Sequence, residues 1–204
     1  MLYCNEKEIN SIMIAKTAKK ELTFQEYLSY EDETNNRYEL VDGRLEAMNP
    51  PTFRHILIAK LIEQTFDQEI SRLKLPWLCL KESGIRTGWR KSRLTDIAVI
   101  KAQDIQEFID QSAVSQIPPL VAVEIVSPES IKRDYRYKRS EYAALEIPEY
   151  WIVDPQENKV TVLLLDEGLY EETVFTGEEK IVSTTFSEIN LTAKEILAAE
   201  YLEN

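Results

Sequence analysis

Leu120-Val-Ala-Val-Glu-Ile-Val126 is the segment of the chain that most strongly predicts a β-strand. Its nearly continuous run of apolar, often β-branched residues is typical of a strand that is covered on both faces of a sheet. Asp96-Ile-Ala-Val-Ile100 has the same character, and helices are expected over 53–73 and 131–146. We therefore expect a central mixed β-sheet flanked by helices, in the α/β or α+β class.

The remaining elements follow from local signals. Thr23-Phe-Gln-Glu26 has the capping-box pattern that begins a helix, expected through about Tyr30. Two short runs around Asp42-Gly43 predict an N-terminal β-hairpin over 37–41 and 44–48. We also expect strands at 77–80, 84–89 and 149–153, a short helix or loop at 103–115, a C-terminal hairpin over 159–165 and 169–175, and a closing helix at 192–202. Residues 1–20 are expected to be a weakly ordered leader or an extra helix, and 21–204 a single domain.

Composition excludes several classes of protein. The 204 residues are 44% hydrophobic and 29% charged, which is ordinary for a globular protein. No stretch approaches the roughly 20 apolar residues of a membrane helix, and the first 20 residues lack the apolar core of a signal peptide, so we expect a cytoplasmic protein with no membrane partner. Cys4, Cys79 and the single His55 are too few for a zinc site, and Cys79 is expected to be a small core residue.

The charge distribution is uneven. A net charge of −12 argues against a generic nucleic-acid binder, which normally has a basic surface. Two basic segments nevertheless interrupt this acidic chain, at 86–93 and 132–139. We expect them to attract an anion locally, with two solvated faces as the alternative.

Two carboxylates interrupt the strongest strands. Asp96 opens one apolar run and Glu124 lies inside the other. A charge within a buried strand is costly unless it is paired or binds a metal. If the strands are neighbours, the two carboxylates can converge, and oxygen ligands suit Mg²⁺ or Mn²⁺. A salt bridge to a nearby arginine or lysine is the alternative for each acid.

Glu39 and Lys138 are two further candidates for the same site. Glu39 lies in the first hairpin, where an exposed position paired with Arg37 or Arg44 is the alternative. Lys138 lies on the helix after the Glu124 strand and can reach back toward the end of that strand, with a solvated helix face as the alternative.

An ordered set of motifs resembles the Uma-two family of proposed endonucleases. The resemblance covers roughly residues 22–200, and the ordered set is specific although no single motif is. The matching pieces are Arg37-Tyr-Glu-Leu-Val-Asp-Gly43, Leu94-Thr-Asp-Ile-Ala-Val-Ile100, Val121-Ala-Val-Glu-Ile-Val-Ser-Pro128, Arg133-Asp134 with Lys138 and Tyr142, and Ile147-Pro-Glu-Tyr-Trp-Ile-Val-Asp154. That family belongs to the PD-(D/E)XK superfamily, so the resemblance implies a restriction-endonuclease-like core.

The resemblance also implies roles for individual residues. Asp96 and Glu124 would be catalytic metal ligands, and Glu39 an additional acid that binds the metal. Lys138 would replace the motif lysine, whose usual place in the strand is held by Val126. Thr95 stands where the family usually has proline. The expected nucleic-acid contacts are Arg86, Arg90, Arg93, Arg133 and Arg136. His55 is expected as a helix-start or core residue, with a place at the site as the alternative.

The activity that the resemblance implies is hydrolysis of DNA phosphodiester bonds by an endonuclease that uses Mg²⁺ or Mn²⁺. The missing strand lysine and the acidic net charge keep an alternative open, which is a catalytically inactive nuclease fold used for binding or assembly. Other anionic substrates, such as RNA or a nucleotide, are a further alternative. The 159–175 hairpin could pair edge to edge, which would give a homodimer, or it could cover a sheet edge of its own chain.

Overall fold

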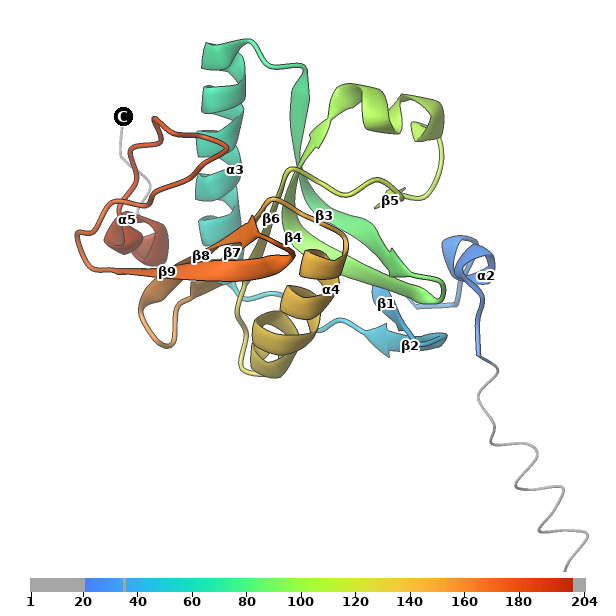
Figure 1. Ribbon diagram of the computed structural model, residues 1–204. Coiled ribbons are helices and arrows are strands. Elements are labelled where there is room, and N and C mark those ends of the chain that lie inside the picture. The colour runs from blue at the N-terminus through green and yellow to red at the C-terminus, as the bar shows by residue number, and fades with distance from the viewer. Residues whose placement is uncertain (1–20, 35, 200–204) are drawn as a thin grey trace, which may run out of the picture.

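The computed structural model describes residues 21–34 and 36–199, and within them the strands form one mixed sheet (Figure 1). The strand order is β2-β1-β4-β6-β7-β8-β9, and β3 pairs with both β4 and β5. The pairs β6–β7 and β3–β5 are parallel, and the other pairs are antiparallel. The strands are β1 (Tyr38–Val41), β2 (Arg44–Ala47), β3 (Trp77–Gly88), β4 (Lys91–Lys101), β5 (Val114–Ser115), β6 (Val121–Ile125), β7 (Glu149–Asp154), β8 (Lys159–Asp166) and β9 (Leu169–Thr176).

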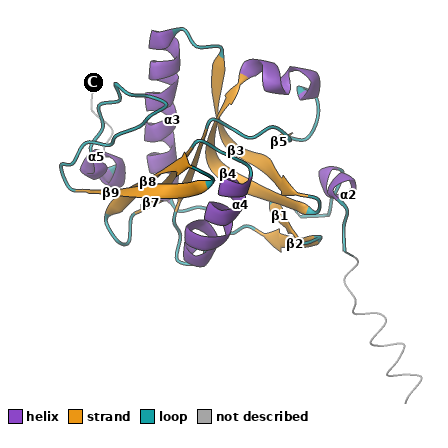
Figure 2. Cartoon of the chain, viewed as in Figure 1, coloured by secondary structure: helices purple, strands orange, loops and turns teal. Residues whose placement is uncertain are grey.

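Helices cover the sheet, as Figure 2 shows, so the expected α/β architecture is confirmed. They are α2 (Phe24–Leu28), α3 (Phe53–Leu73), α4 (Arg139–Ala144) and α5 (Ala193–Ala198), with the 3₁₀-helix η1 (Ala102–Phe108) and the π-helical segment η2 (Arg133–Lys138). None of the described helices combines the length and apolar character needed to cross a membrane.

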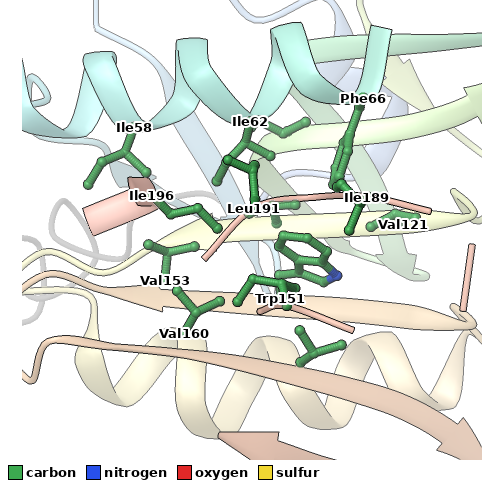
Figure 3. Close-up of a cluster of buried hydrophobic side chains, with 14 of the residues drawn as sticks. Ile58, Ile62, Phe66, Val121, Trp151, Val153, Val160, Ile189, Leu191 and Ile196 are labelled. Carbon is green, nitrogen blue, oxygen red and sulfur yellow. The ribbon is translucent and has the colours of Figure 1, made fainter. Parts of the chain in front are cut away.

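The main core lies between α3 and the sheet (Figure 3). Ile58, Ile62 and Phe66 follow helical spacing and are fully buried, and Phe66 packs edge-on against Trp151 of β7. Ile56, also expected on this face, is 46% exposed. The expected helix over 53–73 is confirmed in full, with Thr52 as its N-cap.

Side-chain alternation along β6 separates two cores. Val121, Val123 and Ile125 belong to the core beneath α3, whereas Ala122 and Val126 belong to a second core beneath α4. Successive strand residues point to opposite faces, so Glu124 projects toward the α4 side. This alternation is what brings the acid of β6 within reach of the following helix.

Both predicted hairpins and the capping box of α2 are confirmed. Asp42 and Gly43 have φ values of 50° and 82°, which is the left-handed turn that an Asp-Gly pair favours. β9 lies at an edge of the sheet, and the homodimer expected from this hairpin stays a prediction. Cys79 is buried, as expected.

Several boundaries differ from expectation. β3 is one strand of 12 residues rather than two pieces, with a backbone irregularity at Glu82, whose φ is 57°. β4 begins at Lys91, so Asp96 lies in the middle of its strand instead of opening it. The helix expected over 131–146 has π-helical winding across η2. The predictions for 1–20, for Cys4 and for the end of the closing helix lie outside the described residues.

Candidate functional site

Asp96 and Glu124 lie opposite each other on neighbouring strands. β4 and β6 pair antiparallel with Ile97 opposite Val123, and one further step of this register brings Asp96 opposite Glu124. Opposite residues of an antiparallel pair project from the same face of a sheet. The pairing therefore produces the convergence of carboxylates that the two strand motifs predicted.

A cavity of about 570 Å³ lies beside this pair. Its wall includes Asp96 of β4, Glu124 and Ile125 of β6, and Asp134 and Lys138 of η2. The basic side chains that line the same cavity are Arg37, Arg54, His55 and Arg133. Acids that can bind a cation and bases that can bind an anion thus line the same cavity.

Both carboxylate oxygens of Glu124 accept hydrogen bonds. Lys138 Nζ donates to Oε2 at 2.7 Å, and the Tyr142 hydroxyl donates to Oε1 at 2.8 Å. Burial raises the pKa of Glu124 to about 8, because the charges of Asp96 and Asp134 add to the desolvation and outweigh Lys138. A further cation near Glu124 would favour its ionised form.

Lys138 Nζ is surrounded by oxygen atoms. Besides Glu124, it donates to the Leu94 carbonyl at 2.7 Å, and it lies 3.4 Å from Glu39 Oε1 and 3.7 Å from Asp134 Oδ1. Burial alone would lower the pKa of Lys138, but the carboxylates, Glu124 above all, raise it beyond its ordinary range. Lys138 is therefore a permanent cation and not a proton acceptor.

Asp96 is the more accessible of the two strand acids. Its side chain is 24% exposed, while that of Glu124 is 3% exposed. The Ile125 amide donates to Asp96 Oδ2 at 2.7 Å, and His55 Nε2 lies 3.1 Å from Oδ1. Burial acts to raise the pKa of Asp96, but the contact with His55 outweighs it and lowers the pKa. His55 starts α3 and lines the site, which was the alternative reading of its sequence position.

Glu39 lies behind Lys138 and is fully buried. Arg93 Nη1 donates to its Oε2 at 2.9 Å, and the Leu94 amide donates to its Oε1 at 3.2 Å. Glu39 is not among the described residues that line the cavity. Its expected part in binding a metal stays a prediction, and its observed partners are the Arg93 and Lys138 side chains and the Leu94 amide.

Arg93 does not present its guanidinium to a ligand. It is 3% exposed and bridges Glu39 to Glu141, donating to the two oxygens of Glu141 at 2.7 and 2.8 Å. This placement does not support the expected contact between Arg93 and nucleic acid. The ion pairs instead couple β1, β4 and α4 beneath Lys138.

The other candidate arginines are dispersed. Arg133 lines the cavity and Arg136 is exposed. Arg86 packs over the Phe24 ring, at 4.2 Å from its centroid, and Arg90 donates to the Leu22 carbonyl at 3.0 Å. Of the five arginines expected to contact nucleic acid, Arg133 is the one whose place at the cavity suits that role directly.

Sequence reasoning did not place Asp134, Tyr142 or Arg54 beside Glu124 or in its cavity. Asp134 and Tyr142 belonged to the motifs of the resemblance, but a charged or aromatic residue on a helix carries no specific signal by itself. Arg54 was visible only as the neighbour of His55. Asp134 and Arg54 line the cavity, and Tyr142 donates a hydrogen bond to Glu124. These contacts depend on the fold and cannot be read from the sequence.

The donor set fits a magnesium ion that keeps part of its water shell. Asp96, Glu124 and the Ile125 backbone line one wall and supply oxygen atoms. Across 21–34 and 36–199, no three Asp, Glu, His or Cys side chains are grouped to bind a metal ion. Water and substrate oxygens would therefore complete the coordination, which is usual for Mg²⁺.

Charge also favours a divalent cation. Acidic side chains outnumber the permanent cations around Lys138. The acids are Glu39, Asp96, Glu124, Asp134 and Glu141, and the cations in contact with them are Lys91, Arg93, Arg133 and Lys138. A bound divalent cation would favour the ionised form of Glu124, whose pKa is raised by burial.

Comparison with known proteins agrees with this architecture. The Uma2 family (Uma-two above), described as "Putative restriction endonuclease", matches residues 24–194. A "putative nuclease belonging to DUF820" from Anabaena variabilis superposes with a TM-score of 0.72 at 20% identity, over 87% of this chain and 98% of its own, and shows the restriction-endonuclease-like fold. The type IIG restriction endonuclease BpuSI aligns with a TM-score of 0.39 at 13% identity, over 74% of this chain and 16% of its own, which is too distant to support an inference. No curated protein matches the chain.

Proposed function

The chain belongs to the Uma2 family, and from this premise we propose that it is a metal-dependent nuclease that hydrolyses DNA phosphodiester bonds. The observation that carries the proposal is the shared cavity of Asp96, Glu124 and Lys138. Two carboxylates with an adjacent permanent cation are suited to a reaction in which charge develops on a phosphate.

Asp96, Glu124 and the Ile125 carbonyl would hold the metal, either Mg²⁺ or Mn²⁺. When bound, such an ion polarises a phosphoryl oxygen and lowers the pKa of a coordinated water. Asp96 is reachable from the cavity. Its contacts with the Ile125 amide and with His55 keep its carboxylate oriented. We propose that Glu39 supports this arrangement through Lys138, because its oxygens face Lys138 and Arg93.

Lys138 would stabilise the negative charge that grows on the phosphate. Its ammonium group is buried, and its raised pKa keeps it charged over the whole working range of pH. The strand position of the usual lysine is held by Val126, which is buried in the second core. A lysine from the following helix thus reaches the same acid from another direction.

Arg54 and Arg133 would contact the phosphates that flank the scissile bond. Both line the cavity, one from the start of α3 and the other from η2. Ionic contacts of this kind position nucleic acid without reading its sequence. Arg86, Arg90 and Arg136 remain proposed contacts for more distant parts of the strand.

Calorimetric titration of Mg²⁺ and Mn²⁺, followed by incubation with supercoiled plasmid, tests the proposal. Wild type should bind metal and nick the plasmid. Asp96→Asn should lose metal binding and at least about 100-fold of the cleavage rate, since even the outer partners of metal ligands are worth about 10- to 100-fold. Asp166→Asn, at the exposed end of β8, is the matched control. Unchanged cleavage by Asp96→Asn would remove Asp96 from the site.

The alternative function is a catalytically inactive nuclease fold that serves binding or assembly. It is favoured by the engagement of both Glu124 oxygens by Lys138 and Tyr142, and by the net charge of −12. This alternative would be supported if the wild type binds metal but cleaves neither plasmid nor RNA and hydrolyses no nucleotide.

A further inference from the structure

Asp134 Oδ1 is a buried carboxylate oxygen without a hydrogen-bond donor. Asp134 is 2% exposed and lines the cavity. Its other oxygen, Oδ2, accepts a hydrogen bond from the Ser130 hydroxyl, which fixes the orientation of the carboxylate. Oδ1 is one of three buried side-chain atoms in the described part of the chain that lack a partner. A buried acceptor without a donor is costly, so a donor is expected in some state of the protein.

Lys138 is the nearest candidate donor. Its Nζ lies 3.7 Å from Asp134 Oδ1 and 2.7 Å from Glu124 Oε2. The other cation nearby, Arg133, has its Nε at 3.9 Å from Asp134 Oδ1. A movement of Nζ by about 1 Å would bring Lys138 within hydrogen-bond distance of Asp134.

Glu39 competes less well for this ammonium group. Its Oε1 lies 3.4 Å from Lys138 Nζ, but it already accepts from the Leu94 amide, and its Oε2 accepts from Arg93. Asp134 Oδ1 has no such donor. The free acceptor is therefore on Asp134.

A cation at Glu124 would disturb the present hydrogen bond. Lys138 occupies Glu124 Oε2, and an ammonium group and a divalent cation at one carboxylate repel each other strongly at such short range. We propose that Asp134 is a positioning residue for metal binding: when a divalent cation binds at Glu124, Lys138 transfers its hydrogen bond from Glu124 to Asp134 Oδ1. The inference rests on the metal site of the proposed function, and Asp134 itself does not touch the cation.

A double-mutant cycle measured by calorimetry with Mn²⁺ tests this transfer. Asp134→Asn keeps the shape of the side chain but removes its charge. In the presence of Lys138 it should weaken Mn²⁺ binding by about 10- to 100-fold, the usual effect of a partner outside the ligand set. In a Lys138→Met background the same substitution should change the affinity less than about twofold, because Asp134 then has no ammonium group from which to accept a hydrogen bond. Asp166→Asn should have no effect in either background.

An equal loss in both backgrounds would overturn the inference, because Asp134 would then act on the cation through its charge alone. No loss in either background would also overturn it. If Lys138→Met does not fold, the ¹⁵N-detected Nζ signal of Lys138 replaces the cycle. This signal should shift when Mg²⁺ is added to wild type and should not shift when Mg²⁺ is added to Asp134→Asn. An unshifted signal in metal-bound wild type would overturn the proposed transfer.

The proposed function and this inference fail in different ways. Absence of metal binding by wild type removes both. Metal binding that is lost in Asp96→Asn, together with an additive cycle, leaves the nuclease site standing and removes only the role of Asp134.

Discussion

Glu39 is a buried carboxylate that depends on the cations around it. Burial acts to raise its pKa, but Lys138 and Arg93 outweigh the burial and lower the pKa below the ordinary value of 4.5. A carboxyl group with a depressed pKa stabilises the fold above its unfolded pKa, and this contribution is lost as the pH falls through the folded value. Glu39 should therefore stabilise the protein at neutral pH and cease to do so in acid.

Glu39→Gln should lower the free energy of unfolding by about 3 kcal/mol at neutral pH, since it leaves two buried cations short of an acceptor. The difference from wild type should shrink as the pH falls below 4.5, where Glu39 of the unfolded chain takes up a proton, and should be lost once the pH is below the lowered pKa of Glu39 in the fold. Urea unfolding at a series of pH values measures it. Glu46→Gln, at the exposed position opposite Glu39 in the hairpin, is the control. A difference that stays constant with pH would contradict the ion-pair account.

The main acids of the site were predictable from single residues. Asp96 begins one apolar run and Glu124 lies inside another, and the cost of burying a charge makes such positions informative. Asp134 offered no comparable signal, because acidic residues are common on helices and are usually solvated there. What distinguishes Asp134 is its buried, unpartnered oxygen, which depends on the fold around it.

At the scale of elements, the helix that carries Lys138 was predicted, but its winding was not. Apolar spacing detects a helix without distinguishing α from π geometry over one or two turns. The π-helical η2 contains both Asp134 and Lys138, and such segments often occur at functional sites. The single long β3 was also missed, because the polar stretch around Glu82 resembles a break in the sequence pattern.

The two hairpins offer a matched test of turn chemistry. Gly43 and Gly168 both have φ of 82°, a conformation that costs a residue with a Cβ roughly 1–2 kcal/mol. A Cβ on Gly168 would meet nothing within 4 Å, whereas a Cβ on Gly43 would collide with the Arg90 guanidinium. That guanidinium holds the Leu22 carbonyl at 3.0 Å and Glu21 at 2.8 Å.

Gly168→Ala should therefore destabilise the protein by about 1 kcal/mol. Gly43→Ala should cost about 1 kcal/mol more, the worth of a hydrogen bond that Arg90 must give up. Thermal unfolding of the two variants gives the comparison directly. Equal losses would show that Arg90 moves aside without cost.

For the whole molecule, the class of fold was predictable and the strand order was not. Apolar runs identify buried strands, but they do not say which strands are neighbours. The parallel pairing of β6 with β7 and the central place of β4 between β1 and β6 emerge only from the structure. That order is what places residues from the first hairpin, the central strands and η2 around one cavity.

The acidic charge of the whole chain limits how it can bind DNA. With a net charge of −12, attraction must come from local groups. Arg54 and Arg133 are the arginines of the cavity wall that have no carboxylate closer than 3.9 Å among the described residues. Each phosphate contact changes the slope of log Kd against log salt by about 0.9 for duplex DNA. The total slope should therefore be small.

Arg54→Gln and Arg133→Gln should each weaken DNA binding and reduce that slope by about 0.9. Arg72→Gln is the control, because Arg72 lies at the other end of α3, about 27 Å from Arg54 at the helical rise per residue. Fluorescence anisotropy of labelled duplex over a salt series measures all three, with Ca²⁺ in place of Mg²⁺ to hold back cleavage. An equal change with Arg72→Gln would mean that total charge governs binding. A change confined to Arg54 and Arg133 would place the DNA backbone along the cavity that contains Asp96 and Glu124.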